Sequence, residues 1–365
     1  MRKLSGSIPL LLLCTLLVTA QAQVRDSLPV PDLPGYRTLK CDLHMHTVFS
    51  DGEVWPTTRI TEAFRDGLDA ISLTDHGTYH PHEKDVGSDA ARPHELARAQ
   101  AERMGIILIP GIEVNEGDTH ANVLFPTDPN ALHGNNLKEV LRRARQQDAF
   151  VFWNHPGWKQ KPDWFPLIAA CYDEKLIQGV ELINGSTFYP EVFPWIEEKK
   201  LTILATSDVH APLAPGRTRP ITLVLARTAD APGIREALLA RRTIAWMGGE
   251  MWGAEEHLRG LWQGAVKLEN PALSWRPGIP GVVLRLRNSS AIPFRFRILR
   301  APAWLAARDG EVREEKTAGV PVTIRKDIPA GRHQLELELE ITNLHVAPGR
   351  NLTVRLPFTL EVGKS

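Results

Sequence analysis

The sequence predicts an α/β domain built on a parallel sheet, followed by a smaller all-β domain. Up to about residue 250, short apolar runs alternate with segments of helical period. After about Leu261 the helical periods vanish and a strict two-residue alternation appears. The length of 365 residues suits one large domain and one smaller domain. Seven or eight strand–helix units are enough for the parallel sheet to close into a barrel.

The expected strands of the first domain, over residues 37–260, are apolar without polar alternation. Such runs are typical of parallel strands that helices cover on both faces. The runs are Thr38–Leu43, Ala70–Leu73, Ile106–Ile109, Ala121–Phe125, Phe150–Trp153, Gly179–Ile183, Leu201–Ala205 and Ile221–Ala226. Between them, Asn136 is the predicted cap of a helix with Glu139 three residues on, and Gly67 is expected to end another helix.

The second domain, over residues 261–365, reads as a half-buried antiparallel sheet. Leu284 and Leu286 face one way, whereas Arg285 and Arg287 face the other, and the same alternation recurs twice nearer the C-terminus. About 100 residues of this pattern suit a small β-sandwich.

The first residues have the organisation of a cleavable signal peptide. Arg2 and Lys3 give a positive start, Ile8–Ala20 is a nearly continuous apolar core, and a small-x-small sequence ends at position 22. We expect residues 1–22 to be removed and residues 23–36 to link to the first domain. The protein would then be exported, to the periplasm or the medium. A retained N-terminal anchor is the alternative.

The cysteines and the charge balance exclude several classes of protein. Cys14 follows Leu13, where a lipidation signal usually has a small residue, and Cys41 and Cys171 are too few and too far apart for a disulfide framework. We expect the latter two to be buried small residues. The 43 basic and 43 acidic residues balance, so charge favours neither long nucleic acid nor an anionic membrane as a partner. No segment after the signal has the ~20 apolar residues that span a bilayer.

Side chains able to bind metal recur where the strands of the first domain end. In a strand, His44 and His46 share a face, and Asp42 and Asp51 add oxygen ligands or hydrogen-bond acceptors beside them. Because the carboxyl ends of barrel strands meet at one mouth, we expect such residues to converge there. The further candidates are Asp75 and His76, Glu113, His120, His155, Asp208 and His210.

Each candidate alone has a plain alternative, since a single His or Asp after a strand is more often a loop or cap residue. The repetition from strand to strand favours a shared divalent cation, because uncompensated charges there would be costly. The remaining histidines lack this placement and read as solvated or structural: His80, His82, His94, His133, His257, His333 and His345.

The order of these motifs resembles the polymerase-and-histidinol-phosphatase (PHP) superfamily. Asp-x-His-x-His-Thr with Ser-Asp-Gly, Thr-Asp-His-Gly, Gly-Ile-Glu-Val, Asn-His-Pro and Ser-Asp-Val-His occur in that family's order over residues 37 to about 250. The resemblance implies a distorted (β/α)7 barrel, up to three metal ions (zinc, manganese or iron) and hydrolysis of phosphoesters. It implies a first ion on His44, His46, Glu113 and Asp208, a second on Glu113, His120 and His155, and a third on His76, His210 and Asp51.

The resemblance also implies a mechanism. A hydroxide held between metals that Glu113 bridges would attack phosphorus, while Asp208 helps to hold the metals and His210 or His76 protonates the leaving group. Asp42 and Asp75 would orient imidazoles. Arg217 and Arg219 would clamp the phosphate, with solvated loop arginines as the alternative.

Three aromatic residues, Trp153, Trp158 and Tyr172, are candidates for the pocket wall. Burial in the core is the more common fate for a residue placed like Trp153, which ends an apolar run.

The layout of the whole chain resembles an exported bacterial branch of the superfamily that cleaves phosphodiesters, including haloalkyl phosphate diesters. A small phosphate ester, specifically a diester, is therefore the expected substrate. A phosphomonoesterase or a nuclease of the same superfamily is one alternative. An exported module that binds metal or a phosphorylated ligand without catalysis is the other.

Overall fold

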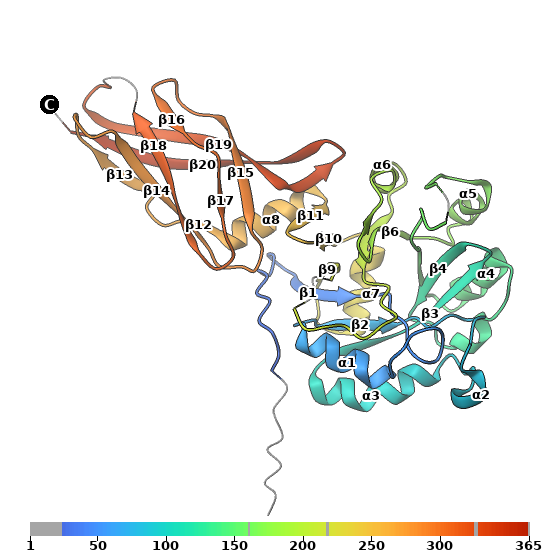
Figure 1. Cartoon of the computed structure of the whole chain (residues 1–365). Helices are drawn as coiled ribbons and strands as arrows, with labels where there is room; N and C mark the ends of the chain where they lie inside the picture. The colour runs from blue at the N-terminus through green and yellow to red at the C-terminus, as the bar shows by residue number, and fades with distance from the viewer. Residues whose placement is uncertain (1–23, 160, 217–218, 325–327, 364–365) are drawn as a thin grey trace, which may run out of the picture.

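The computed structural model describes residues 24–159, 161–216, 219–324 and 328–363. The expected signal peptide, residues 1–22, lies outside the described residues. The expected linker is described from residue 24 on. No described helix is long and apolar enough to cross a membrane. Figure 1 shows an α/β part and an all-β part, with the N-terminal segment running between them.

The first part alternates strands and helices as the sequence predicts. Its strands are β1 (Arg37–Asp42), β2 (Ala70–Leu73), β3 (Ile107–Glu116), β4 (Thr119–Leu124), β5 (Phe150–Trp153), β6 (Gly179–Asn184), β7 (Thr187–Phe188), β8 (Thr202–Thr206), β9 (Ile221–Ala226), β10 (Thr243–Met247) and β11 (Glu250–Gly253). Its helices are α1 (Pro56–Arg65), α2 (Glu83–Val86), α3 (Arg92–Met104), the 3₁₀ helix η1 (Pro129–Leu132), α4 (Leu137–Gln146), α5 (Pro166–Asp173), α6 (Val192–Glu198), α7 (Ala231–Leu239) and α8 (Glu255–Ala265).

The sheet of this part is mixed, although the sequence predicts a parallel one. Strands β1, β2 and β3 are parallel, as are β5, β6 and β8, but β4 is antiparallel to both of its neighbours and β9 is antiparallel to β1. The physical reason at β4 is the two-residue turn that Gly117 opens with a φ of 58°. So short a connection allows only an antiparallel hairpin.

Strand β3 is longer than its apolar run because it changes partner. It pairs with β2 up to Pro110 and with β4 from Gly111 onward. Glu113 therefore lies inside the strand rather than in the loop that follows it.

Side-chain hydrogen bonds bring β8 against β9 and help to close the barrel. Thr222 Oγ1 of β9 accepts a hydrogen bond from Ala205 N of β8 (3.0 Å) and donates one to its carbonyl oxygen (2.8 Å). Beneath the mouth, one buried cluster unites side chains of β1, β2, β3, β4, β5, β8 and β9, among them Phe150, Phe152 and Leu204. This is the distorted barrel that the sequence predicts.

The helix ends and the cysteines agree with their predictions. Asn136 Oδ1 accepts from Glu139 N (3.0 Å) and caps α4, and Gly67, with a φ of 74°, follows the end of α1. Cys41 and Cys171 are unpaired and buried.

The second part is a two-layer β structure that is antiparallel as predicted, except that Ala272–Trp275 pairs in parallel with Thr359–Val362. Its strands are β12 (Val266–Leu268), β13 (Ala272–Trp275), β14 (Gly281–Asn288), β15 (Phe294–Arg300), β16 (Leu305–Ala307), β17 (Gly310–Val312), β18 (Thr317–Ile324), β19 (Gly331–Ala347) and β20 (Arg350–Val362). One layer has the order β12-β14-β18-β16, and the other contains β13, β20, β19, β15 and β17. The predicted boundary after residue 260 lies inside α8.

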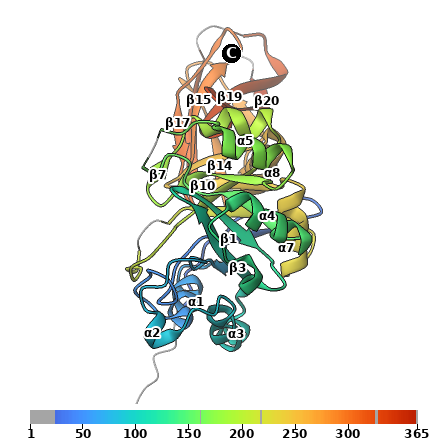
Figure 2. The ribbon, with the colours of Figure 1, turned by 90° about the vertical axis from the view of Figure 1, so that its right-hand side faces the viewer.

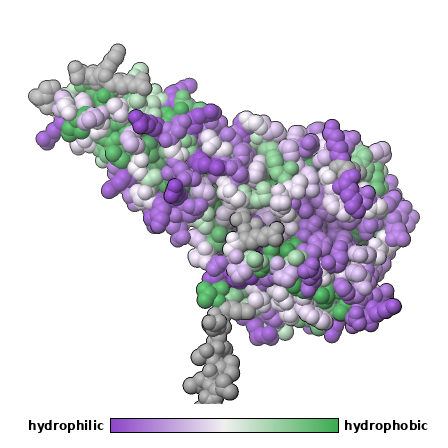
Figure 3. Space-filling model, in the orientation of Figure 1, coloured by the Kyte–Doolittle hydropathy of each residue, from purple (hydrophilic) through white to green (hydrophobic). Residues whose placement is uncertain are grey.

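The two parts share a sheet and a core. Strand β19 pairs in parallel with β11, opposite Met251 and Trp252, so its layer continues the sheet of the barrel. One hydrophobic cluster runs from α1 and β2 through β10 and α8 into the sandwich. Residues 24–36 join both parts: Asp26 N donates to Arg65 O (2.8 Å), and Ala291 N donates to Pro29 O (2.7 Å). Figure 2 shows this stacking from the side, and in Figure 3 hydrophilic residues are interspersed over both parts of the visible face.

Candidate metal centre

The predicted ligands converge at the mouth of the barrel. They come from the segments that follow four strands (β1, β2, β5 and β8) and from the β3–β4 hairpin, and a pocket of about 400 Å³ opens among them. Eight of the nine line this pocket: His46, Asp51, His76, Glu113, His120, His155, Asp208 and His210. The ninth, His44, is fully buried beside them.

Glu113 lies at the centre of the cluster with 1% of its surface exposed. Each carboxylate oxygen meets imidazoles from different strands. Oε2 is 3.3 Å from His44 Nε2, 3.2 Å from His46 Nε2 and 3.2 Å from His76 Nδ1, and Oε1 is 2.9 Å from His120 Nδ1 and 3.3 Å from His155 Nε2. One carboxylate can therefore serve two neighbouring cation positions.

The potential ligand atoms form four overlapping groups within which all atoms lie within 4.8 Å of one another. The groups are His44, His46 and Asp208; His44, Glu113 and His155; His76, Glu113 and His120; and His46, Asp51, His76 and His210. The structure thus brings together the residues of all three predicted sites. His44, His46 and His76 each belong to two of the four groups. Which ion each residue binds stays a prediction.

The hydrogen bonds behind His44 and His46 aim their Nε2 lone pairs into the cluster. His44 Nδ1 is 2.8 Å from Glu181 Oε1, and a carboxylate only accepts, so Nδ1 carries the proton. His46 Nδ1 faces Ser50 Oγ at 3.2 Å, and Ser50 gives its own proton to Asp75 at 2.7 Å.

In the neutral rings, two lone pairs then face each other at 3.1 Å, with Asp208 Oδ1 3.1 Å from His46 Nε2 and 3.2 Å from His44 Nε2. Asp208 Oδ1, Asp51 Oδ1 and His155 Nδ1 are buried without a hydrogen-bond partner. This convergence of lone pairs fits divalent cations.

Without a cation, protons take its place. Burial lowers the pKa of His46, but the hydrogen bonds and charges of Asp208 and Glu113 outweigh it and raise this pKa to about 10. Burial likewise opposes the charged forms of Glu113 and Asp208, yet the neighbouring imidazoles hold both carboxyl pKa values below their usual range. Cation binding must therefore displace protons from the cluster.

Glu181 of β6 is a functional candidate that the sequence analysis missed. It is fully buried and, besides His44, accepts hydrogen bonds from His155 N (2.6 Å), Thr206 Oγ1 (2.6 Å) and Asn184 Nδ2 (2.9 Å). It therefore orients one ligand ring and the backbone of a second ligand. A carboxylate in the middle of an apolar strand was the signal that could have found it.

Asn154 was also missed as an individual residue, although it belongs to the Asn-His-Pro motif. Its Nδ2 donates to Glu113 Oε1 (2.8 Å) and to Asn122 Oδ1 (3.0 Å), while its Oδ1 accepts from Asn122 N (3.0 Å). These bonds fix the orientation of the central carboxylate.

The two aspartates predicted to orient imidazoles differ in what they contact. Asp75 acts on His46 through Ser50, and it also accepts from the Thr47 backbone N–H and hydroxyl, both at 2.7 Å. Asp42 instead accepts from Ser207 N (3.1 Å) and lies 3.0 Å from Arg219 Nη2. It therefore holds the chain just before Asp208 rather than an imidazole.

Backbone constraints also place the ligands. A Cβ on Gly52 would lie 2.5 Å from His46 C and Thr47 N, so the Ser-Asp-Gly turn that carries Asp51 can close only with glycine. His155 and Asp208 have φ values of 26° and 49°, in the left-handed region. Such strain in non-glycine residues is typical of functional sites.

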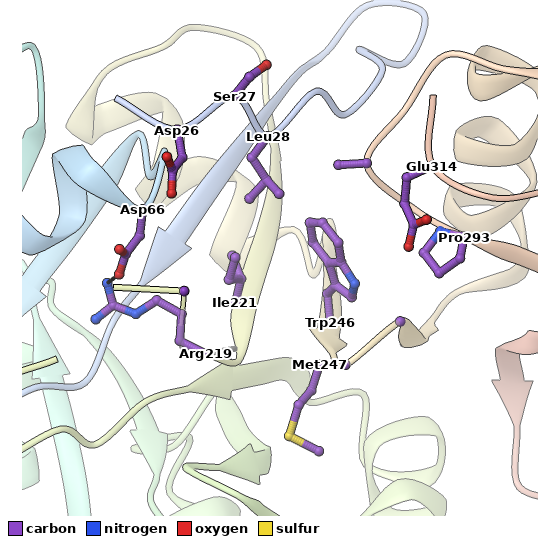
Figure 4. A pocket seen from close by; sticks show the side chains of 14 residues that line it. Asp26, Ser27, Leu28, Asp66, Arg219, Ile221, Trp246, Met247, Pro293 and Glu314 are labelled. Atoms are coloured by element: carbon purple, nitrogen blue, oxygen red, sulfur yellow. Dashed lines mark hydrogen bonds and ion pairs between the residues drawn. The ribbon is translucent and has the colours of Figure 1, made fainter. Parts of the chain in front are cut away.

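The predicted phosphate clamp is not assembled at this pocket by Arg219. Its guanidinium is almost buried, paired with Asp42 and, through Nη1, with Asp66 at 3.3 Å. Arg219 lines a separate pocket of about 570 Å³ between the two parts, together with Trp246 and Glu314 (Figure 4). Figure 4 shows the Arg219 side chain pointing toward Asp66. Arg217 lies outside the described residues.

Of the three aromatic candidates, one lines the pocket and two do not. Trp158 lines the pocket, with its ring centre 5.0 Å from that of His120. Trp153 is 1% exposed and stacks on Trp195 in the core, which is its expected alternative fate. Tyr172 donates to Lys199 O (3.0 Å) and does not line this pocket. The histidines that were expected to be structural belong to none of the ligand groups found within the described chain. One of them, His345, pairs with Glu250 at 2.7 Å instead.

Comparisons with known proteins agree with this geometry. The PHP domain family matches residues 42–208. The crystal structure of a two-domain protein from Bacteroides vulgatus, containing a predicted PHP-like metal-dependent phosphoesterase, has a TM-score of 0.84 and 40% sequence identity to this chain. The match covers 92% of this chain and 100% of that one.

Two nucleases show weaker similarity. A 5′-3′ exoribonuclease from Haemophilus influenzae is 37% identical over 78 residues, 21% of this chain, so the match spans about a quarter (24%) of that curated relative. A lesion-specific endonuclease from Pyrococcus furiosus has a TM-score of 0.41 at 14% identity, over 60% of this chain and 59% of its own, which is too low to bear on function.

The Bacteroides vulgatus relative is 40% identical over its whole length, and the family match covers the ligand-bearing strands. The chain belongs to the PHP domain family.

Proposed function

We propose that the protein hydrolyses phosphate diesters, with two or three divalent cations (zinc, manganese or iron) bound at the mouth of the barrel. The observation that carries this proposal is Glu113, whose two buried oxygens contact five imidazoles within 3.3 Å. Cations bound there would lower the pKa of a water that they bind and neutralise charge on a phosphate ester.

The predicted ligand sets overlap the groups of neighbouring ligand atoms in part: His44, His46 and Asp208 form one group, whereas His120 and His155 each join Glu113 in a different group. His44, His46 and Asp208 would hold one cation, which Glu113 would share with a second on His120 and His155. The third position would use Asp51, His76 and His210, which also form a group with His46.

Hydrolysis adds water across one P–O bond, so the attacking water loses a proton and the departing oxygen gains one. His210 is suited to supply that proton. Its Nδ1 donates to the Asp208 carbonyl oxygen (2.9 Å), which leaves Nε2 directed at Asp51 (3.3 Å), and the side chain is 38% exposed. Binding a third cation and donating a proton exclude each other because both use Nε2. His76 belongs to the same third position, so it is the alternative donor if it is unliganded.

The charge of the pocket favours a diester over a monoester. Among its described lining residues Lys159 is the one lysine or arginine, and it pairs with Asp118 at 3.6 Å. A monoester carries up to two negative charges at neutral pH and a diester carries one. A pocket with so few basic side chains beyond its cations suits the diester.

The test is a substrate comparison on metal-loaded protein. We expect bis(p-nitrophenyl) phosphate to be cleaved faster than p-nitrophenyl phosphate, and Glu113→Gln to abolish both metal binding and cleavage. The matched control Glu198→Gln changes an exposed glutamate outside the pocket and should behave as wild type. A faster monoester reaction would favour the phosphomonoesterase. A metal-replete protein inert toward mono-, di- and triesters would favour a non-catalytic binding module.

A nuclease is the second candidate because of the exoribonuclease match. The zero net charge argues against long nucleic acid, since phosphate backbones select basic surfaces. Oligonucleotides belong in the substrate panel. Their cleavage well ahead of small organophosphate diesters would shift the proposal to a nuclease.

We further propose that the protein is exported after cleavage following Ala22. N-terminal sequencing of protein from the producing cell tests this, and a mature chain that retains Met1 would contradict it.

A further inference from the structure

We propose that Trp158 and Tyr79 form two aromatic walls that receive the organic substituents of the substrate, so that diesters with planar aromatic groups are preferred over small alkyl diesters. This inference rests on the proposed function and names the substrate class for the same pocket.

The two residues are exposed aromatic side chains at the cation cluster. Trp158 is 38% exposed and Tyr79 is 55% exposed, and both line the pocket. The Trp158 ring centre lies 5.0 Å from that of His120 and 5.4 Å from that of His155, and the Tyr79 ring centre lies 6.2 Å from that of His76.

A chain of ring contacts joins the walls across the cluster. It runs from Tyr79 to His76, from His76 to His120 at 5.5 Å, and from His120 to Trp158. A phosphate held by cations on these histidines points its two substituents in different directions. Each substituent can therefore meet a different aromatic side chain.

The position of Trp158 is tied to a predicted ligand. The backbone N–H of Trp158 donates to the His155 carbonyl oxygen (2.9 Å) and closes a turn that contains Pro156 and Gly157. A Cβ on Gly157 would lie 2.7 Å from the Tyr189 ring, so the turn packs tightly against the body of the protein. The turn that presents His155 to the cluster therefore also fixes the indole.

A solvent-exposed lysine side chain lies against one face of the indole. The Lys159 ammonium lies 3.9 Å from the Trp158 ring centre, and the lysine side chain is 58% exposed. A planar group can replace a long exposed lysine without disturbing the core, and the ring face is then free for stacking. Single exposed aromatic residues are common on protein surfaces, so the test needs a control variant at an exposed aromatic residue outside the pocket.

The experiment uses two anions whose P–C bonds resist hydrolysis, diphenylphosphinate and dimethylphosphinate. Their dissociation constants are measured by calorimetry on metal-loaded protein. We expect wild type to bind the diphenyl compound at least about tenfold more tightly, within the range known for stacking on aromatic side chains. Trp158→Ala should reduce this ratio about five- to tenfold and Tyr79→Ala about threefold.

Two further variants separate stacking from general damage. Trp158→Phe should keep most of the preference because it keeps a ring, and Trp55→Ala should keep all of it, since Trp55 is 53% exposed but does not line the pocket. Metal content should be unchanged in all four. In hydrolysis of bis(p-nitrophenyl) phosphate, the wall substitutions should raise KM and leave kcat nearly constant.

Equal affinity for the two phosphinates in wild type, or a ratio that neither wall substitution changes, overturns the inference. Failure of the proposed function looks different: wild type then cleaves no diester, whatever the phosphinate ratio.

Discussion

Glu181→Gln isolates the effect of a residue that binds no cation itself but orients two predicted ligands. The four hydrogen bonds to Glu181 come from donors on both of its oxygens: His44 Nδ1 and Thr206 on Oε1, His155 N and Asn184 on Oε2. In glutamine one oxygen becomes an NH2 group. Whichever way the amide turns, that NH2 faces two donors in a fully buried site.

The magnitude follows from these contacts. Losing hydrogen bonds to a buried charged group costs about 1.5–3 kcal/mol each, partly recovered where the amide oxygen still accepts, so we expect a loss of about 3 kcal/mol in stability. At about 1–2 °C per kcal/mol for a chain of 365 residues, Tm falls by about 3–6 °C. If the NH2 faces His44, the ring must carry its proton on Nε2, which blocks that ligand atom. Changes in groups that orient ligands weaken metal binding about 10–100-fold.

The assay is competition with a chelating indicator of known affinity, alongside thermal unfolding with and without added cation. Glu198→Gln is the matched control, since its carboxylate is exposed and pairs with Lys199. Wild-type cation affinity in Glu181→Gln would refute the reasoning that ring orientation at His44 depends on this carboxylate.

The other predictions concern one candidate ligand, the cations, the Ser-Asp-Gly turn and a surface carboxylate. His155→Ala should lose one metal equivalent by elemental analysis and nearly all activity on bis(p-nitrophenyl) phosphate while still folding; full activity would contradict its assignment. Chelation of the cations should lower Tm by about 4–8 °C, because a ligand at a thousand times its Kd contributes about 4 kcal/mol; an unchanged Tm would mean that the cluster binds none. Gly52→Ala should cost about 2–4 kcal/mol in a denaturant titration and deplete the cation position at Asp51, because its Cβ would strike backbone 2.5 Å away; normal stability would show that the turn can relax. Hydrogen bonds from Arg142 and Lys138 lower the pKa of Glu174 to about 2, below its unfolded value of 4.5, so its stabilisation is complete above pH 4.5 and fades as the pH falls toward 2. Glu174→Gln should therefore have a slightly lower Tm than wild type at pH 6 and a difference that narrows between pH 5 and 3; a constant difference would exclude this linkage.

The strands and the ligand positions were predictable because both follow from contiguous local patterns. An apolar run such as Phe150–Trp153 must be buried, and a histidine two residues after it must lie close to the strand end. The direction of β4 was less evident, because an apolar run has no polarity of its own and only the short turn at Gly117 specifies an antiparallel hairpin.

Contacts that depend on side-chain direction could not be predicted. Arg219 follows the last ligand strand closely in sequence, but the loop turns it toward Asp42 and Asp66 instead of the cluster. Glu181 reads as one polar residue in an apolar run, and its importance appears only when β5 and β8 bring His155 and Thr206 to it. Neither the contacts of Arg219 nor those of Glu181 can be deduced from the spacing of the residues along the chain.

The parallel pairing of β11 with β19 has a consequence for biosynthesis. A ribosome that has finished β11 must add about ninety residues before the partner segment at Leu344 and His345 emerges. Until then the barrel ends in an open strand carrying Met251 and Trp252, and open apolar strands recruit one another. A nascent chain stalled or cut in this interval is the form most exposed to aggregation.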